Sequence, residues 1–168
     1  MLRLFNKIRK TGMVTETIAV DSDLQALGVE VKSVINKRFA GSFAIRAVDS
    51  GSCNACELEI HALNNAFYDI ERFGVHFVAS PRHADALLVT GPVSQHMAQA
   101  VLDVWEATPE PKWLLAMGDC AVDGGEFAGS YAVMGGIAKI LKPDVIIPGC
   151  PPTPEVILKA ILGLLHNT

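Results

Sequence analysis

Short apolar runs, several of which end in glycine, constrain the fold of this chain more than any other feature of its sequence. Five such runs lie at residues 43–48, 75–79, 85–91, 112–118 and 144–149. Their length and nearly continuous apolar character are typical of strands that are buried on both faces. Helical patterns separate most of them, at about residues 56–67, 94–107, 131–141 and 154–165. Strands that alternate with helices predict an α/β fold in which helices cover both faces of a parallel sheet.

The length of the chain favours a single domain. Its 168 residues can bury one sizeable core and are too few for two comfortable ones. We expect residues 41–168 to form this domain and residues 1–40 to form an amphipathic, helical N-terminal extension. Within the extension, residues 23–39 place apolar side chains at helical spacing. Residues 1–12 mix apolar and basic side chains, which suits an anionic membrane surface, a partner groove or a frayed tail.

The composition excludes some classes of function. A formal net charge of -4, without a long basic run, argues against a nucleic-acid-binding protein. Half of the residues are hydrophobic, and an apolar surface covered by a partner would absorb the excess. No stretch approaches the roughly 18 apolar residues that span a bilayer, and the N-terminus lacks a secretory signal. We therefore expect the chain on the cytoplasmic side of a membrane or in the cytoplasm, where thiols stay reduced.

All four cysteines follow predicted strands. Cys53 and Cys56 follow the first run, Cys120 follows the fourth and Cys150 follows the fifth. The carboxyl ends of parallel strands share one edge of the sheet, and open α/β folds build their sites at that edge. The sequence therefore predicts that four thiols converge.

In a reducing compartment, converging thiolates indicate a metal centre more than disulfides. Their spacing alone does not separate tetrahedral zinc from an iron-sulfur cluster. The Cys150-Pro151 step recurs beside cluster ligands, whereas structural zinc usually takes two close cysteine pairs and this chain has only one. These features favour a cluster, with zinc and buried unligated cysteines as the alternatives.

Ordered blocks of sequence resemble a known family. The blocks are GSCNACELEI, YDIERFG, SPRHADALLVTGPV, PEPKW, GDCAVDGGEFAGSYAV and PGCPPTPE. Over about residues 41–165 the chain resembles the small subunit shared by respiratory complex I, where it is the 20 kDa or B subunit, and by membrane-bound, energy-converting nickel-iron hydrogenases of the formate hydrogenlyase type. The resemblance implies a flavodoxin-like fold with one 4Fe-4S cluster. The implied ligands are Cys53, Cys56, Cys120 and Cys150.

The residues around the cysteines distinguish the branches of this family. The complex I form typically has two adjacent cysteines, whereas Asn54 and Ala55 separate Cys53 from Cys56, as in the hydrogenases. Asp119 favours the same branch. The resemblance therefore implies an electron-transfer subunit of a membrane-bound hydrogenase complex. The alternatives are a complex I-like subunit that passes electrons to quinone and a zinc-stabilised structural module.

The resemblance also implies partners and a location. The chain would contact a large catalytic subunit, of the nickel-iron hydrogenase type or of the complex I 49 kDa-like type, at whose interface the active site lies. A ferredoxin-like iron-sulfur subunit and membrane-arm subunits complete the expected set. Such a complex places the chain, as a peripheral subunit, on the cytoplasmic side of the inner or cell membrane.

Two glutamates open the helix that follows Cys56. Glu59 matches the complex I pattern three residues after the second cysteine, while the glutamate position of standard hydrogenases falls on Leu58. We consider Glu59 a candidate for coupling proton movement to electron transfer, although an acidic residue in a first turn also complements the helix dipole. Glu57 is a weaker candidate, and His61 lies four residues beyond it, at the spacing of a surface pair.

Overall fold

A computed structural model describes residues 2–12 and 21–167 of the chain. The helices are α1 (Leu2–Thr11), α2 (Ser22–Arg38), α3 (Ala55–Leu63), α4 (Gln95–Ala107), α5 (Asp119–Asp123) and α6 (Pro154–Asn167). The strands are β1 (Phe43–Asp49), β2 (Val75–Phe77), β3 (Ala86–Thr90), β4 (Trp113–Met117) and β5 (Val145–Ile147). Each strand falls within or overlaps an apolar run of the sequence, so the predicted strands are confirmed.

The strands form one sheet in the order β2-β1-β3-β4-β5, and every neighbouring pair is parallel. This order is that of flavodoxin-like folds, so the predicted α/β class is confirmed. The chain runs from β1 outward to β2, and then crosses back to β3 on the other side of β1. The carboxyl ends of β1 and β3 therefore flank the switch point of the sheet, where folds of this kind bind their ligands.

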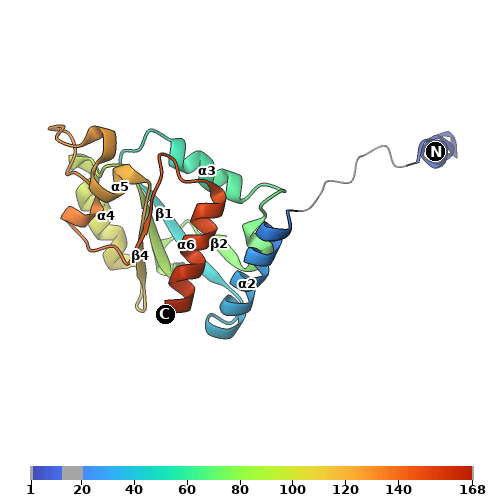
Figure 1. Ribbon diagram of the computed structural model, residues 1–168, viewed down its shortest axis with the longest axis horizontal. Helices are drawn as coiled ribbons and strands as arrows, with labels where there is room; N and C mark the ends of the chain where they lie inside the picture. Colours follow the sequence, from blue (N-terminus) through green and yellow to red (C-terminus); the bar gives the residue numbers. More distant parts are fainter. Residues whose placement is uncertain (1, 13–20, 168) are drawn as a thin grey trace.

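Helices cover both faces of the sheet (Figure 1). Alternate residues of a strand point to opposite faces, which the two hydrophobic clusters show directly. Leu115 and Met117 of β4 belong to the cluster that includes residues of α2, α3 and α6. Leu114 and Ala116 belong to the second cluster, with residues of α4 and α5. The sheet is thus buried on both sides, and only its edges are open for a site.

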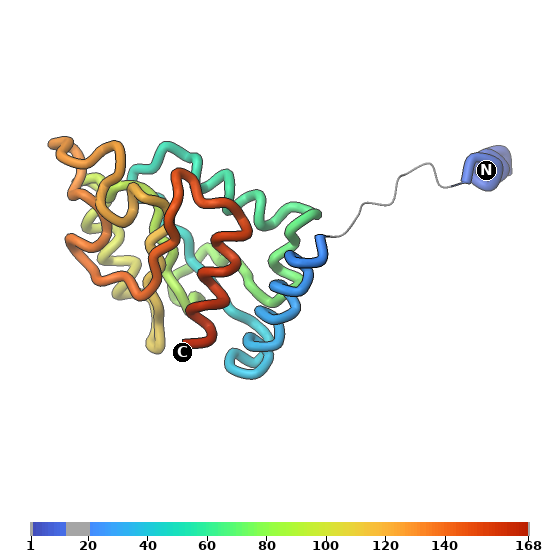
Figure 2. Tube along the Cα trace, viewed as in Figure 1, coloured from blue at the N-terminus to red at the C-terminus, as the bar shows by residue number. Residues whose placement is uncertain are grey.

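The two N-terminal helices differ in burial. The carboxylate of Asp21 caps α2 by accepting hydrogen bonds from the Asp23 and Leu24 N–H groups, and α2 buries Leu24 and Ile35 in the core. No residue of α1 is buried, and Figure 2 draws it away from the sheet. The division between an extension at 1–40 and a domain at 41–168 stays a prediction. Within residues 2–12 and 21–167, the structure contains no helix with the length and hydrophobicity of a membrane span.

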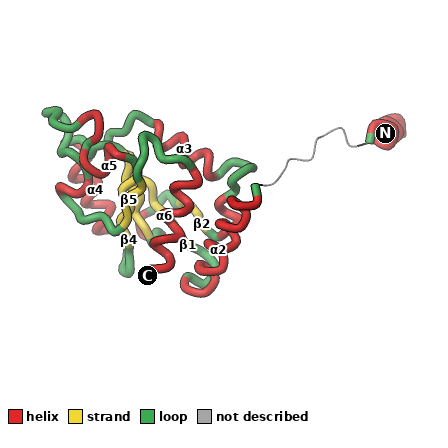
Figure 3. The backbone as a smooth tube through the Cα atoms, viewed as in Figure 1, coloured by secondary structure: helices red, strands yellow, loops and turns green. Residues whose placement is uncertain are grey.

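The helix predicted at residues 131–141 is wrong. Only a short 3-10 turn, Ile137–Lys139, forms there, and the rest is loop (Figure 3). Gly135 and Gly136 adopt φ angles of 87° and 94°, which interrupt a right-handed helix in the middle of the apolar pattern. The segment instead runs back beside the loop after β3, where the Met134 N–H donates to the Val93 carbonyl at 2.7 Å.

Candidate metal centre

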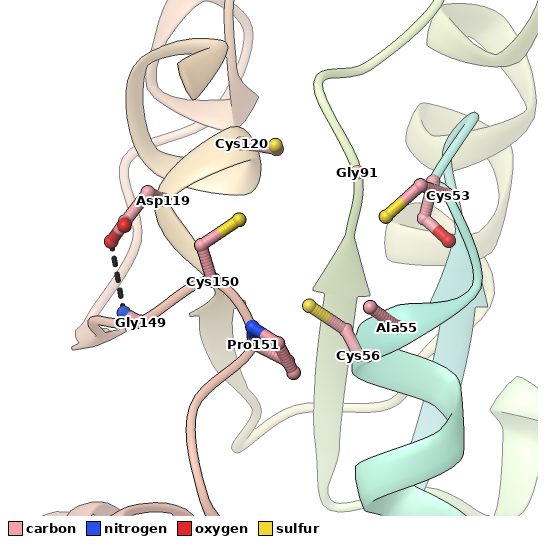
Figure 4. Close-up of a pocket in the computed structure, with 11 residues that line it drawn as sticks. Cys53, Ala55, Cys56, Gly91, Asp119, Cys120, Gly149, Cys150 and Pro151 are labelled. Carbon is pink, nitrogen blue, oxygen red and sulfur yellow. Dashed lines mark hydrogen bonds between the residues drawn. The ribbon is translucent and has the colours of Figure 1, made fainter. Parts of the chain in front are cut away.

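The four cysteines line a single pocket at the carboxyl edge of the sheet. Figure 4 shows their sulfur atoms directed into the space between two groups of loops, with Cys53 and Cys56 on one side and Cys120 and Cys150 on the other. All four are free thiols; Cys53 and Cys150 are exposed, and the other two are half-buried. The empty space of the pocket is about 300 Å³, including solvent at its mouth. The predicted convergence of the thiols is therefore confirmed.

The loop after β1 presents Cys53 and Cys56. The Asp49 carboxylate accepts hydrogen bonds from the N–H groups of Gly51 and Ser52, at 2.8 and 2.7 Å, and so turns the chain at the end of the strand. Asn54 then adopts a left-handed conformation, with φ 71°, immediately before α3 begins. Cys56 consequently lies in the first turn of α3.

Glu57 connects this loop to the neighbouring strand. Its carboxylate accepts one hydrogen bond from the Ser52 hydroxyl, at 2.5 Å, and another from the hydroxyl of Thr90. Thr90 is the last residue of β3 and is 1% exposed. The surface pair predicted between Glu57 and His61 is not among the ion pairs that the described residues form.

Asp119 joins the loops that carry Cys120 and Cys150. Its carboxylate accepts a hydrogen bond from the Gly149 N–H at 2.9 Å, and its own N–H donates to the Gly149 carbonyl at 3.0 Å. One residue earlier, the Gly118 N–H donates to the Ile147 carbonyl at 2.8 Å. These bonds continue the pairing of β4 with β5 beyond the strands, so the two thiols are held on a shared backbone.

Glycine is required where the loops approach most closely. A Cβ on Gly118 would lie 2.8 Å from the Cys56 sulfur, and a Cβ on Gly91 would lie 2.6 Å from the Ser52 nitrogen. Both glycines also have φ angles, 85° and 81°, that other residues rarely adopt. Gly91 brings the end of β3 into the pocket, although β3 is followed by no cysteine.

The surroundings keep the inner thiols protonated. Burial raises the pKa of Cys56 to about 12, and the negative charges of Glu57 and of the other three thiols add to the effect. Burial and the charge of Cys150 also raise the pKa of Cys120, against a lowering by a hydrogen bond from the Glu126 backbone. At neutral pH the Cys56 thiol therefore keeps its proton until positive charge enters the pocket, and a metal centre supplies that charge.

Glu59 lies on α3 but does not line the pocket. It is half-buried, and its charge acts on Tyr68, whose pKa is raised by burial first and then by Glu155 and Glu59. Leu58 is 60% exposed. The role of Glu59 in proton coupling stays a prediction.

The four thiols line one pocket and border a common space from different sides. Within the part of the chain that the structure describes, no group of three or more His, Cys, Asp or Glu side chains forms a site for a metal ion.

The sequence does not indicate that Asp49, Thr90 and Asp119 hold the cysteine loops in place. Asp49 and Thr90 look like ordinary ends of strands, and Asp119 serves only to distinguish the branches of the family. The available signal was positional: each of these residues ends a strand or begins the loop after it, at the edge where the cysteines converge.

The sequence of this chain is similar to those of known proteins. The model of the NADH ubiquinone oxidoreductase 20 kDa subunit family matches residues 53–164. Formate hydrogenlyase subunit 7 of Escherichia coli is 45% identical over 140 residues, which cover 82% of this chain and 55% of that protein. The probable membrane-bound hydrogenase subunit mbhJ of Pyrococcus furiosus is 49% identical over 120 residues, 71% of this chain and 72% of that one.

One relative with a solved structure is similar to this chain in both sequence and fold. A chain in the structure of the membrane-bound sulfane sulfur reductase, an archaeal respiratory membrane complex, aligns with a TM-score of 0.67 at 32% identity. The alignment covers 80% of this chain and 72% of that chain. This chain thus spans just over half of the Escherichia coli relative and most of the other two.

Proposed function

The chain belongs to the NADH ubiquinone oxidoreductase 20 kDa subunit family, and on this premise we propose that it is the electron-transfer subunit of a membrane-bound nickel-iron hydrogenase complex. It holds one 4Fe-4S cluster on Cys53, Cys56, Cys120 and Cys150. Through that cluster it exchanges single electrons with the active site of a large subunit. The observation that carries the proposal is the meeting of all four thiols in one pocket.

The pocket fits such a cluster in its donor set and in its backbone. Iron-sulfur clusters are held by cysteine thiolates, and this edge of the sheet supplies four from three separate loops. The four thiols border a common space, and Cys53 and Cys56 form the only close pair among them in the sequence, whereas structural zinc usually takes two such pairs. When bound, the cluster supplies a one-electron carrier.

The residues of this chain hold and shield that carrier. The first turn of α3 carries Cys56, so the positive end of the helix dipole lies on the side of the pocket where a cluster would bind. Gly118 allows the loop after β4 to pack directly against the Cys56 sulfur. Asp119 joins the loops that carry Cys120 and Cys150 through its two hydrogen bonds to Gly149.

The spacing of the first two cysteines favours the hydrogenase branch, because Asn54 and Ala55 separate Cys53 from Cys56 and Asn54 is the N-cap of α3. Sequence identity does not separate the branches, since NADH-quinone oxidoreductase B subunits match at 45% and 47%, close to the values of the two hydrogenase relatives. We accordingly propose a large nickel-iron subunit, a ferredoxin-like subunit and membrane-arm subunits as partners, on the cytoplasmic side of the membrane.

The ligand assignment is tested by replacing single thiols. In the purified complex, Cys120→Ser and Cys150→Ser should each abolish the electron paramagnetic resonance signal of the reduced cluster and lower its acid-labile sulfide. Ala55→Ser is the matched control, because it adds a hydroxyl to the same pocket and removes no thiol. An unchanged signal in either cysteine variant defeats the assignment.

A complex I-like subunit that serves quinone is the second candidate, and the family to which the chain belongs favours it. The position of Glu59, three residues after Cys56, also matches that branch. Nickel analysis of the purified complex separates the two candidates: one nickel per complex supports the hydrogenase, and its absence together with quinone reduction supports the alternative. One zinc per chain without labile sulfide would leave only a structural module.

A further inference from the structure

Both carboxylate oxygens of Glu57 accept hydrogen bonds from other side chains, unlike those of a helix residue that only faces solvent. Its two carboxylate oxygens accept from different hydroxyls, Oε2 from Ser52 and Oε1 from Thr90. The two donors are on different elements, since Ser52 lies in the cysteine loop and Thr90 ends β3. One carboxylate therefore connects the start of α3 both to the loop before it and to the neighbouring strand.

The Ser52 bond reaches the backbone between the cysteines. While the Ser52 hydroxyl donates to Glu57, its oxygen accepts a hydrogen bond from the Asn54 N–H at 3.0 Å. Asn54 is in the left-handed region, at φ 71°, where non-glycine residues are uncommon. The chain of bonds from Glu57 through Ser52 thus stabilises the turn that sets the relative positions of Cys53 and Cys56.

The Thr90 bond fixes the same loop against the sheet. Thr90 is buried, and the following Gly91 lies so close to the loop that an added Cβ would meet the backbone of Gly51 at 2.9 Å. The Ser50 hydroxyl contributes on the same side by donating to the Thr90 carbonyl at 2.5 Å. Glu57 therefore acts at a junction where β1, β3 and α3 meet within contact distance.

We propose that Glu57 is a positioning residue for the metal centre, acting through Ser52 on the Cys53–Cys56 turn and through Thr90 on the placement of that turn against β3. The inference rests on the proposed cluster, and it assigns Glu57 rather than Glu59 as the acidic residue that the centre depends on. A carboxylate is needed because both of its oxygens accept, whereas a glutamine offers one accepting oxygen and one donating amide.

The test compares three substitutions in the purified complex. Glu57→Gln removes one of the two accepting oxygens, Thr90→Val removes one hydroxyl at nearly constant shape, and Ser52→Ala removes the connection to Asn54. Glu155→Gln is the control, because Glu155 is an exposed acidic residue in the first turn of another helix, α6. The readouts are the rate of iron release to a chelator under anaerobic conditions and amide hydrogen exchange over residues 50–57.

We expect Glu57→Gln and Ser52→Ala to accelerate iron release by about 10-fold to 100-fold, the usual effect of removing a residue that orients metal ligands. Hydrogen exchange in the loop should accelerate with them, and Thr90→Val should show a smaller change in both. Iron release and exchange equal to those of Glu155→Gln in all three variants would overturn the inference. If the unchanged complex holds no iron or labile sulfide, the proposed function fails, and the exchange rates alone then decide the positioning role.

Discussion

The pocket has two walls that are built in different ways. The β1 wall carries Cys53 and Cys56, and it is held mainly by side-chain hydrogen bonds, those of Asp49 and Ser50 and those among Ser52, Glu57 and Thr90. The β4–β5 wall carries Cys120 and Cys150, and backbone bonds beyond the strands join its two loops, together with the carboxylate of Asp119.

Because of this difference, the two walls should differ in how strongly single substitutions affect them. Substitutions other than proline leave the backbone N–H and C=O groups in place, so the β4–β5 wall can keep the bonds from Gly118 to Ile147 and from Asp119 to Gly149 when the side chain at position 119 is changed. The β1 wall depends on hydrogen bonds made by more side chains, those of Asp49, Ser50, Ser52, Glu57 and Thr90, each of which can be replaced. We therefore expect single substitutions to loosen the β1 wall more readily than the β4–β5 wall.

The largest effect is expected from Gly118→Ala, because this substitution disturbs both walls of the pocket. Its Cβ would lie 2.8 Å from the Cys56 sulfur of the opposite wall, and the residue would be strained at φ 85°. Iron and labile sulfide in the purified protein should fall to the level of Cys120→Ser. The control is Gly163→Ala in α6, where an added Cβ meets nothing within 4 Å and should stabilise the helix by about 0.5–1 kcal/mol. Full iron content in Gly118→Ala would contradict the close approach.

A smaller effect is expected from Asp119→Ala, which tests the β4–β5 wall alone. Loss of the bond from the Gly149 N–H to the carboxylate should cost about 0.5–1.5 kcal/mol, because the carboxylate is exposed and solvent screens its charge. Urea unfolding of the metal-free full chain measures this change in the free energy of unfolding. Asp119→Asn keeps an accepting oxygen and should lose less. Equal losses in both variants would show that the charge, not the bond, is what stabilises this wall.

Combining one substitution from each wall tests whether the two walls contribute independently to stability. Ser52→Ala and Asp119→Asn remove groups that share no hydrogen-bond partner. Their effects on the free energy of unfolding should add within about 0.5 kcal/mol, as for independent sites. A coupling of 1 kcal/mol or more, roughly twice that limit, would mean that the walls form one unit even without the metal centre.

The smallest effect is expected from α1, which belongs to neither wall. Phe5 and Ile8 are 67% and 59% exposed, so the double change Phe5→Ser with Ile8→Ser should alter the free energy of unfolding by less than about 0.5 kcal/mol. Ile35→Ala in α2 is the positive control, because Ile35 is fully buried and its truncation should cost about 2–5 kcal/mol. A large loss from the α1 change would show that α1 packs on the domain.

The sheet and the meeting of the cysteines were predictable because both follow from local patterns. An apolar run such as Leu87–Val89 marks a buried strand, and parallel topology then brings every strand end to one edge. Knowing that Cys120 and Cys150 each follow a strand was therefore enough to bring them together. No contact between side chains had to be known in advance.

The rest depended on contacts between distant residues. The hydroxyl of Thr90 meets Glu57 across 33 positions of sequence, and the Gly149 N–H meets Asp119 across 30. Neither residue belongs to a motif that predicts the other. The helix predicted around Gly135 failed for a different reason: apolar periodicity was present, but the paired glycines there adopt positive φ angles and turn the chain back.

The exposure of Cys53 and Cys150 has a consequence for how the protein must be assembled. In the chain by itself, water and dioxygen can reach a metal centre through the outer side of the pocket, where these two thiols are exposed. The large subunit that we propose as a partner would cover this side. We expect a metal centre in the isolated chain to be short-lived in air and to become durable only once the neighbouring subunit is in place.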